Sequence, residues 1–530
     1  MTGAHRPGAA HQPGGAHRPD GARRGRDRRA YLLPPRPGAP RIDGPRPTTA
    51  VVGGGIAGLA AATALAERGV GVTLYERETY LGGRAGGWPV DLADGSTATM
   101  SRGFHAFFRQ YYNLRGLLRR TDPRLERLTA LPDYPLQHSS GLRDSFRHVP
   151  RTPPWSALGF VALSPSFGLR DLRAMNPLAA LPLLDVRVPE VYERLDDTSA
   201  YDFLEAVRFP SRARHLAFEV FSRSFFADPR KLSAAEMVLM FHIYFLGSAE
   251  GLLFDVPRAP FPAALWDPLA DYLRRHGADV RTGTVVEHIA RTPDGGYVVT
   301  VDGGERRHDT VVLALDAAGL RSLVGRSDRL GSAPWRERIQ RLRTAPPFLV
   351  TRMWLDRPVD PARPGFLGTS GYGGLDNISV LERWEDEATR WAARTGGSVV
   401  ELHAYAVRPD ASRDVEQKRL TEELHRVYPE TRRATVLDVR HEWRQDCPSF
   451  PVGGYPDRPT VRTPEPGLVL AGDLVRTDLP VALMERAATS GFLAANALLE
   501  RWGVRGQTLW TVPNQGRGAA LRALARWGSG

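Results

Sequence analysis

Three glycines near the start of the chain have the spacing of a backbone turn that can close around a pyrophosphate. Gly53, Gly55 and Gly58 follow a short apolar run and open an alanine-rich stretch. The first glycine permits the tight turn, the second lets the backbone approach the phosphates, and the third lets the helix pack closely on the strand. The amides of Ile56 and Ala57 would lie at the helix N-terminus, where the helix dipole favours an anion. The pattern predicts a site for the phosphates of a dinucleotide.

An acidic residue completes this unit. Glu76 ends a second short apolar run, 18 residues after Gly58. A carboxylate at the end of the second strand can accept hydrogen bonds from ribose hydroxyls, and it disfavours a 2′-phosphate. Arg77 follows directly and is included in the predicted site. The order of strand, glycine turn, helix, strand and acid is the context that a dinucleotide-binding motif requires.

Two further segments favour FAD over NAD as the dinucleotide. Gly83 lets the backbone pass close to a ligand, and Arg84 beside it can neutralise a phosphate. Near the other end of the chain, Gly472 and Asp473 follow an apolar strand, where a carboxylate suits the ribityl hydroxyls. A helix that begins near Met484 would aim its first amides at the edge of the flavin that becomes negative on reduction. The sequence therefore predicts non-covalent FAD.

The composition indicates a globular protein without a nucleic-acid face, a metal site or a membrane span. Of the net charge of +12, residues 1–48 carry ten Arg and three Asp, or 10 − 3 = +7, and no nucleic-acid motif accompanies them. Cys447 is the single cysteine, which excludes an internal disulfide or a cysteine-rich metal site and indicates a reducing cytoplasm. The longest apolar run, residues 237–246, is far shorter than the roughly 18 residues that span a bilayer.

The elements that must position these residues predict an α/β protein (α+β overall). A discontinuous Rossmann-like FAD-binding domain would be joined to a second, substrate domain of antiparallel sheet and apolar helices. Residues 1–48, with nine Pro and eight Gly, lack apolar runs, so we expect residues 1–47 to be a disordered basic tail. The FAD-binding domain is expected at 48–100, 262–325 and 440–503, the substrate or membrane-facing domain at 101–261 and 326–439, loops at 81–150, and a C-terminal tail at 504–530.

The glycine motif, the Arg84 segment and the Asp473 segment together resemble the flavin amine oxidase and carotenoid desaturase superfamily over residues 48–503. This resemblance implies that the backbone of Val286 meets the adenine. Members that oxidise amines often place a lysine near the flavin. The chain has only Lys231, in a polar turn, and Lys418, on a charged helix, so amine oxidation loses support.

One segment is similar to plant-type phytoene and ζ-carotene desaturases. Residues 100–114 read Met-Ser-Arg-Gly-Phe-His-Ala-Phe-Phe-Arg-Gln-Tyr-Tyr-Asn-Leu. We place Phe104, His105 and Phe107 nearest the flavin ring, and we include Gly103 among the cofactor-binding residues. His105 is a candidate base for proton loss. A hydrogen-bonded structural histidine is an equal alternative at this position.

The same run, with residues 512–517, more narrowly resembles the carotenoid φ-ring synthases, also called isorenieratene synthases. This resemblance implies desaturation of a β-ionone ring to an aromatic φ-ring, from β-carotene to isorenieratene, with one methyl of the geminal pair moving to the neighbouring carbon. The only nucleotide fold is assigned to FAD, which leaves no site for a methyl donor. We therefore expect hydride loss, an intramolecular methyl shift in the ring cation and proton loss, beside an aromatic wall that stabilises the cation.

Two other functions stay open: a linear carotene desaturase or isomerase, and a flavin-bound carotenoid carrier without turnover. A carotenoid substrate implies a cytoplasmic protein that is peripheral on the membrane. Residues 155–186 and 237–254 are candidates for a membrane-docking surface or a tunnel mouth, or else buried helices of the second domain. Residues 519–527 would form a short basic amphipathic helix suited to an anionic bilayer surface, or would pack on the body.

Overall fold

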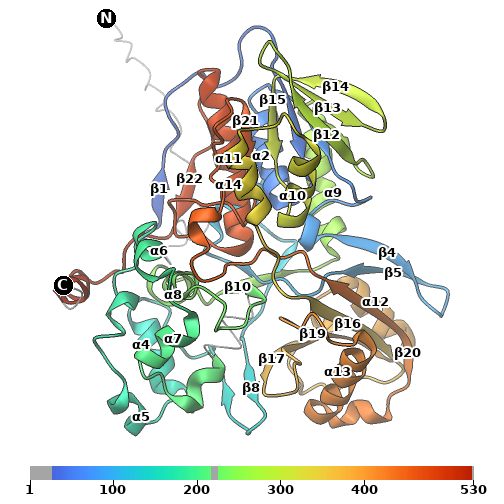
Figure 1. Ribbon diagram of the computed structural model, residues 1–530. Helices are drawn as coiled ribbons and strands as arrows, with labels where there is room; N and C mark the ends of the chain where they lie inside the picture. The colour runs from blue at the N-terminus through green and yellow to red at the C-terminus, as the bar shows by residue number, and fades with distance from the viewer. Residues whose placement is uncertain (1–26, 217–224, 528–530) are drawn as a thin grey trace, which may run out of the picture.

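The computed structural model of the protein describes residues 27–216 and 225–527. A five-stranded parallel sheet forms the core of its upper half (Figure 1). The sheet brings together three distant parts of the chain, which confirms the predicted discontinuous fold. In spatial order its strands are β11 (Asp279–Arg281), β3 (Gly71–Tyr75), β2 (Thr48–Val52), β15 (Thr310–Leu313) and β21 (Leu468–Leu470).

The helix after the glycine turn is enclosed on all sides. All residues of α2 (Ile56–Ala66) are buried, and most of them are alanine, glycine or leucine. Helix α14 (Leu483–Arg501) packs across it, where Gly491 lies so close that a Cβ there would come within 2.2 Å of the Ala57 carbonyl oxygen. Small residues therefore let two helices from opposite ends of the chain meet over the sheet.

A smaller layer covers the other face of the parallel sheet. It contains an antiparallel three-stranded sheet and two helices, which Figure 1 places at the upper right. Residues Tyr297, Val299 and Val301 alternate inward along its central strand, as expected for a strand with one buried face. The elements are β12 (Val286–Arg291), β13 (Tyr297–Val301), β14 (Gly304–His308), α10 (Ala317–Arg326) and α11 (Ala333–Arg341).

A seven-stranded sheet forms the lower right of the molecule (Figure 1). Its pairs are antiparallel apart from one parallel pair, β17 with β8. In spatial order the strands are β20 (Val436–Arg444), β16 (Phe348–Leu355), β19 (Ser398–Ala404), β18 (Asn377–Val380), β17 (Phe366–Ser370), β8 (Leu136–His138) and β9 (Arg143–Asp144). Helices α12 (Asp386–Thr395) and α13 (Arg413–Val427) pack on it. Strand β20 carries the sheet past residue 439, where we expected the second domain to end.

Short apolar helices form the lower left of the molecule (Figure 1). The predicted docking segment at 237–254 is buried along nearly its whole length, so that candidate is wrong. It folds as α8 (Ala234–Phe241), the π-turn His242–Leu246 and the start of β10 (Phe254–Pro257). The neighbouring helices are α4 (Trp155–Leu163), α5 (Leu169–Ala174), α6 (Glu190–Leu195) and α7 (Ala200–Ala206).

The expected disorder of residues 1–47 is wrong for the part that the structure describes. Strand β1 (Tyr31–Leu33) pairs with β22 (Leu509–Thr511), and Asp27 is fully buried in an ion pair with Arg517 at a separation of 490 residues. Residues 1–26 lie outside the described residues. The pairing strand lies at the other end of the chain, so local composition carries no sign of it.

Residues 81–150 also hold more regular structure than the loops we expected. Strands β4 (Gly87–Asp91) and β5 (Thr97–Ser101) form a hairpin around Asp94-Gly95, a dipeptide typical of such turns. Helix α3 (Tyr112–Leu118) and strands β6 (Phe107–Phe108) and β7 (Leu128–Ala130) follow. The hairpin delivers the chain to the segment that contains His105.

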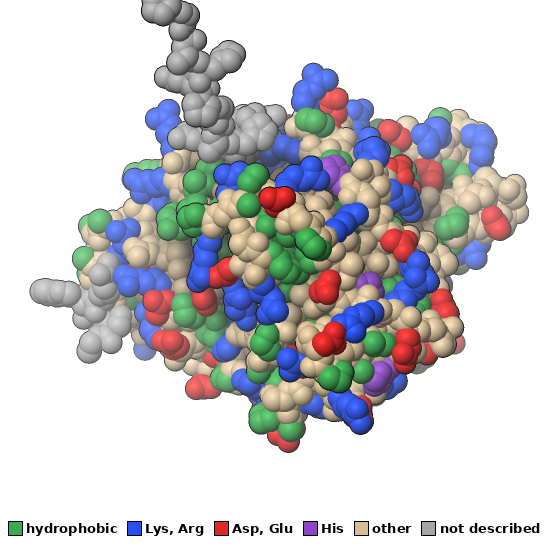
Figure 2. Space-filling view, turned by 90° about the horizontal axis from the view of Figure 1, so that it is seen from above, with side chains coloured by type: hydrophobic (Ala, Val, Ile, Leu, Met, Phe, Trp, Pro, Cys, Tyr) green, Lys and Arg blue, Asp and Glu red, His purple; other side chains and the backbone are tan. Residues whose placement is uncertain are grey.

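Three further properties of the described residues bear on function: membrane-spanning potential, metal-binding potential and surface charge. Among the described residues, no helix has both the length and the apolar character to cross a bilayer. The same residues contain no group of three or more His, Cys, Asp or Glu side chains placed to hold a metal ion. On the face seen in Figure 2, Arg side chains are interspersed with acidic ones rather than gathered in one patch.

Candidate active site

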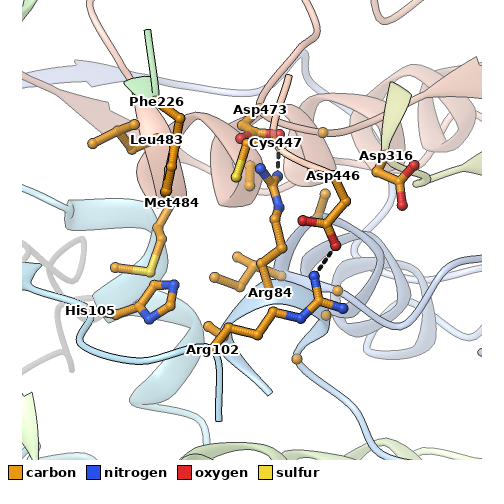
Figure 3. A pocket seen from close by; sticks show the side chains of 18 of the residues that line it. Arg84, Arg102, His105, Phe226, Asp316, Asp446, Cys447, Asp473, Leu483 and Met484 are labelled. Carbon is orange, nitrogen blue, oxygen red and sulfur yellow. Dashed lines mark hydrogen bonds and ion pairs between the residues drawn. The ribbon is translucent and has the colours of Figure 1, made fainter. Parts of the chain in front are cut away.

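A cavity of about 730 Å³ starts at the carboxyl ends of β2 and β3 and continues between the two halves of the molecule. Its first part is lined by the glycine turn, the end of β3 and the segment around Arg84. Its second part is lined by many aromatic side chains, with a polar stretch at Thr369, Ser370, Asp376 and Asn377. A close view shows Arg84, Asp473, His105 and Met484 gathered around the junction of the two parts (Figure 3).

The glycine turn leaves one position open toward the cavity. A Cβ on Gly58 would lie 1.9 Å from the Gly53 carbonyl oxygen, and a Cβ on Gly53, whose φ is +108°, would lie 2.3 Å from the Ala314 carbonyl oxygen. A Cβ on Gly55 would instead meet nothing closer than the Gly83 Cα, at 3.9 Å. No side chain among the described residues caps the start of α2. The amides there are free to bind an anion that approaches over Gly55.

The carboxylate of Glu76 is fixed at the end of β3. It accepts hydrogen bonds from the amides of Gly54 (2.6 Å) and Glu78 (2.8 Å). Burial raises the pKa of Glu76, while these two amides act in the opposite direction. The side chain of Arg77, which is 56% exposed, points toward Asp316 across the cavity, and Val286 lines the same wall. This end of the cavity has the acceptor and the apolar surface that a ribose and an adenine need.

Arg84 and Asp473, which we predicted for different parts of the cofactor, form one ion pair at 2.6 Å (Figure 3). Burial alone would lower the pKa of Arg84, but Asp473 raises it well above its ordinary value, so the guanidinium stays charged. Cys447 lies beside this pair, where burial raises the pKa of its thiol to about 12. A thiol of that pKa is unreactive, which favours a non-covalent cofactor. Arg102 pairs with Asp446 and is a structural partner there.

These features fit FAD. The open position at Gly55 and the uncapped amides suit the pyrophosphate, and the fixed Glu76 carboxylate suits the ribose. Gly472, Asp473 and Met484 line the opposite wall, nearly 400 residues away in sequence. Each predicted cofactor-binding residue lines the cavity except Gly58 and Gly103. Gly58 supports the turn from behind, and Gly103 borders a second cavity of about 60 Å³.

His105 faces the cavity beside Met484 (Figure 3). Its Nδ1–H donates to the Gly103 carbonyl oxygen at 2.8 Å, since a carbonyl can only accept. Burial lowers the pKa of His105 to about 4, so the ring is neutral near pH 7. Phe104 lines the same wall, but Phe107 does not. It is fully buried against Phe261, because adjacent residues of β6 point in opposite directions and Phe108 is the one that faces the cavity.

The second part of the cavity is an aromatic chamber. The rings of Phe104 and Phe366 lie 4.2 Å apart, Tyr134 stacks on Phe366 at 5.0 Å, and Phe108 lies 4.7 Å from Tyr244. Such walls suit a flat apolar ligand, and their negative ring faces stabilise a nearby cation. Further rings that line it are Tyr111, Phe146, Phe226, Phe245, Phe254, Phe348 and Tyr405.

Most of this chamber was not predicted from the sequence. Apart from Phe104, the residues were not among the predicted site residues. They come from strands, loops and the helical segment His242–Leu246, whose pattern indicates only a packed core. Backbone strain is a clearer sign. Of the six non-glycine residues with positive φ in the described part of the chain, Phe226 and Leu483 line the cavity and Ala406 follows Tyr405, with φ values between +51° and +54°; Leu125, Arg208 and Asp302 lie elsewhere. Non-glycine residues seldom adopt this conformation, and they gather at functional sites.

The two lysines lie away from the cavity. Lys231 is exposed, and the side chain of Lys418 is 79% exposed on α13, where it pairs weakly with Glu422. His242, in the buried π-turn, has its Nε2 against the Pro513 carbonyl oxygen at 2.8 Å. It serves as a core histidine that ties the C-terminal segment to the apolar helices.

Comparison with known families and proteins agrees with this geometry. Residues 56–499 match the family of flavin containing amine oxidoreductases. A carotenoid phi-ring synthase of Streptomyces griseus is 71% identical over 94% of this chain and 97% of its own length. A carotenoid phi-ring synthase of Chlorobaculum tepidum is 28% identical over 88% of this chain and 90% of its own. A probable zeta-carotene desaturase of Synechococcus elongatus is 25% identical over 85% and 98%.

Solved structures of the same fold act on other substrates. A putrescine oxidase superimposes with a TM-score of 0.63 at 16% identity, covering 86% of this chain and 100% of its own. Cyclohexylamine oxidase from Brevibacterium oxydans gives a TM-score of 0.61 at 15% identity, covering 86% and 99%. These likenesses concern the fold alone.

Proposed function

The chain belongs to the flavin-containing amine oxidoreductase family, and we propose that within it the protein is an FAD-dependent carotenoid φ-ring synthase. The observation that carries the proposal is the 71% identity, over 94% of this chain, to the synthase of Streptomyces griseus. The proposed reaction converts the β-ionone ring of a β-carotene-like substrate to an aromatic φ-ring, with migration of one methyl group within the molecule.

The cavity supplies what such a reaction needs from the protein. When bound, FAD is the oxidant that accepts hydride from the ring. The residues of the chain hold the ring in place, exclude water and face the positive charge that hydride loss leaves on it. The aromatic chamber suits each of these tasks, because its many rings give it apolar surface and their faces are negative.

We propose that Phe104 and His105 contact the reacting ring. Both line the wall of the cavity near Met484, and the neutral ring of His105 adds no positive charge against the substrate cation. The hydrogen bond to Gly103 fixes the orientation of the imidazole and leaves Nε2 without a partner among the described residues.

The test is the pigment profile of cells that make β-carotene and express this protein. We expect carotenoids with one or two aromatic end groups, identified by mass and by absorption spectrum. Unchanged β-carotene, with a soluble FAD-loaded protein in the same cells, would contradict the proposal.

A linear carotene desaturase is the second candidate, favoured by the 25% identity to the Synechococcus elongatus protein. Cells that accumulate phytoene or ζ-carotene discriminate between the two. A longer polyene chromophore in those cells, and no aromatic product from β-carotene, would favour the linear desaturase.

We further propose that the surface of α4 and the segment after α5 docks on the membrane. Trp155, Leu158, Leu163 and Leu178 are 62%, 57%, 57% and 68% exposed. Exposed arginines lie in the same stretch, at 147, 151, 170 and 173. The surface backs onto the cavity, because Phe160 of α4 stacks at 4.8 Å on Phe146, which lines it. Apolar side chains with interspersed arginines suit an anionic bilayer surface.

The triple variant W155S/L158S/L163S tests this docking surface. Each side chain would otherwise bury against lipid with a gain of about 1.5 kcal/mol. The three together contribute about 4.5 kcal/mol, so we expect binding to phosphatidylglycerol vesicles to fall by about 1000-fold. The matched control is L437S, which removes a 44% exposed leucine on β20. Co-sedimentation with vesicles measures both. Equal binding by the triple variant and the wild type would refute the docking surface.

A further inference from the structure

A buried chain of hydrogen bonds leads away from the wall of the aromatic chamber. Tyr405 lines the chamber, and its hydroxyl lies 2.7 Å from Nδ1 of His403. Nε2 of His403 lies 2.9 Å from a carboxylate oxygen of Glu401, and Arg352 donates two hydrogen bonds to the other oxygen, at 2.9 and 2.6 Å. The side chains of His403 and Glu401 are each 1% exposed. Buried ionisable groups are costly, so such a chain calls for a function.

The direction of each proton follows from what each atom can do. A carboxylate only accepts, so Nε2–H of His403 donates to Glu401. With one ring proton placed there, Nδ1 accepts from the Tyr405 hydroxyl. Burial alone would raise the pKa of Glu401, but Arg352 and His403 lower it to about 2. Burial raises the pKa of Tyr405 well above its ordinary value, so it rests as a phenol. The three groups follow the order seen in catalytic triads, in which a hydroxyl is hydrogen-bonded to a histidine and a carboxylate orients that histidine.

The chain joins two cavities. Tyr405 lies on the wall of the large one, and Glu401 and Arg352 line the second cavity of about 60 Å³ together with Glu385. That volume has room for one or two water molecules. The hydrogen-bonded chain therefore runs from the aromatic chamber to a small polar cavity, which is lined by two carboxylates and one guanidinium.

The chain also lies against the segment that faces the substrate. A Cβ on Gly103, whose φ is +88°, would come within 2.2 Å of the His403 ring. The backbone nitrogen of Phe104 lies 3.3 Å from Nε2, a packing contact rather than a hydrogen bond when Nε2 carries the proton that Glu401 accepts. On the other side, the ring of Phe226 lies 4.9 Å from that of Tyr405. Both side chains line the same cavity as Leu483 and Met484, which are predicted to lie at the flavin edge.

Resting on the proposed function, we propose that Tyr405 is the catalytic base that accepts a proton from the substrate ring, and that His403 and Glu401 are its positioning residues. Each hydride that leaves the ring must be matched by a proton for the ring to return to neutral. In the proton step a ring C–H bond breaks, its electron pair forms the new ring double bond, and the proton binds the Tyr405 oxygen. At the same time the hydroxyl proton passes to Nδ1 of His403, and the imidazolium faces Glu401.

His105 is less suited to hold this proton. No carboxylate among the described residues bonds to its ring, and Arg84 lies close enough to act against its protonation. The groups that face Tyr405 and His403 differ in charge. The Asp376 carboxylate accepts a hydrogen bond from the backbone amide of Tyr405 at 2.6 Å, and the Asn377 side-chain amide donates to the Tyr405 hydroxyl at 3.0 Å. Tyr134 and Glu401 are the other groups that face Tyr405.

The test compares Y405F, H403Q and E401Q, each assayed for aromatic-ring formation in lysates of β-carotene-producing cells, per mole of bound FAD. We expect Y405F to slow the reaction about 100-fold and H403Q or E401Q about 10-fold. The double variant Y405F/H403Q should be no slower than Y405F, because the residues act as one unit. The matched control is Y428F, which removes a buried hydroxyl with no hydrogen-bond partner among the described residues and should keep full activity.

The outcomes separate the two proposals. If neither the wild-type protein nor Y428F makes an aromatic product, the proposed function is wrong. If the wild type is active and Y405F is equally active, Tyr405 is not the catalytic base. The same follows if an additional variant, H105Q, is the only slow one. A purely structural network would lower FAD content and the unfolding midpoint in step with the rate, and its defects would add in the double variant. If Y405F fails to bind FAD, H403Q decides, since His403 does not line the cavity and its replacement by Gln leaves the Arg352–Glu401 ion pair in place.

Discussion

The G55A variant is expected to fold normally and to lose FAD. A Cβ at this position meets nothing in the protein closer than 3.9 Å, so the turn itself tolerates a methyl group. The methyl would project into the space where the pyrophosphate approaches the amides of α2. Loss of two charge-assisted hydrogen bonds at about 1.5–3 kcal/mol each predicts an FAD affinity at least about 100-fold weaker.

The G58A variant distinguishes the ligand effect from damage to the fold. Its Cβ would lie 1.9 Å from the Gly53 carbonyl oxygen, a contact that forces the turn and α2 apart. We expect G58A to lose stability as well as FAD. The control is G116A, whose Cβ in α3 would meet only the flexible end of Arg120, at 3.7 Å. It should keep wild-type FAD content and gain about 0.5–1 kcal/mol.

Flavin absorbance of the purified protein, titration of the apoprotein with FAD, and the unfolding midpoint measure these three variants. G55A that retains wild-type FAD affinity would contradict the placement of the pyrophosphate over this turn. G55A that fails to fold would contradict the open position that the structure gives to Gly55.

The second large effect is expected from E236Q. Glu236, on α8, is 1% exposed and pairs with Arg486 of α14 at 2.9 Å and with Arg458. These arginines are also buried, and Arg486 bonds the carbonyl oxygens of Val481 (2.9 Å) and Asp473 (3.3 Å). The carboxylate therefore ties the apolar helices to the start of α14. Neutralising it leaves two buried guanidinium groups without a counter-charge, which costs about 3–5 kcal/mol.

The pH dependence of this effect has a definite sign. Burial alone would raise the pKa of Glu236, but Arg486 and Arg458 hold it below the ordinary value of 4.5. A carboxyl whose pKa is lower in the folded state stabilises the fold above the unfolded pKa, and this contribution is lost as the pH falls through the folded pKa. The difference in unfolding free energy between wild type and E236Q should therefore be full near pH 7 and should shrink below about pH 4.5.

Denaturant unfolding at a series of pH values measures this difference. The control is Y192F, which removes a 2.9 Å hydrogen bond to the same carboxylate but no charge, and should cost about 1 kcal/mol. If E236Q costs no more than Y192F near pH 7, the network does not stabilise the fold in the way we describe.

Much of the cofactor end follows from the sequence alone. Gly53, Gly55, Gly58 and Glu76 lie within one strand–turn–helix–strand unit, where every contact is short in sequence, so the pattern of residue types is sufficient to predict the geometry. The strand that ends before Asp473 was predictable because a buried parallel strand is a continuous apolar run.

The pairing of residues that are far apart was decided only by the tertiary structure. Arg84 and Asp473 were each expected to contact the cofactor, and the structure shows that they also bind each other across 389 residues. Phe107 and Phe108 are adjacent residues of the same type, so the sequence does not distinguish them. Only the orientation of β6 in the folded protein decides which one faces the cavity.

The sequence by itself thus determined the dinucleotide site, the α/β class and, through family likeness, the carotenoid chemistry. The tertiary structure decided the substrate end. His403 lies on β19 and Tyr405 directly follows that strand, whose sequence indicates only a packed sheet, and His403 meets Phe104 across 299 residues. The physical reason is that the flavin turn is held by local backbone geometry. The chamber around the substrate exists only where two sheets and a group of helices close against one another.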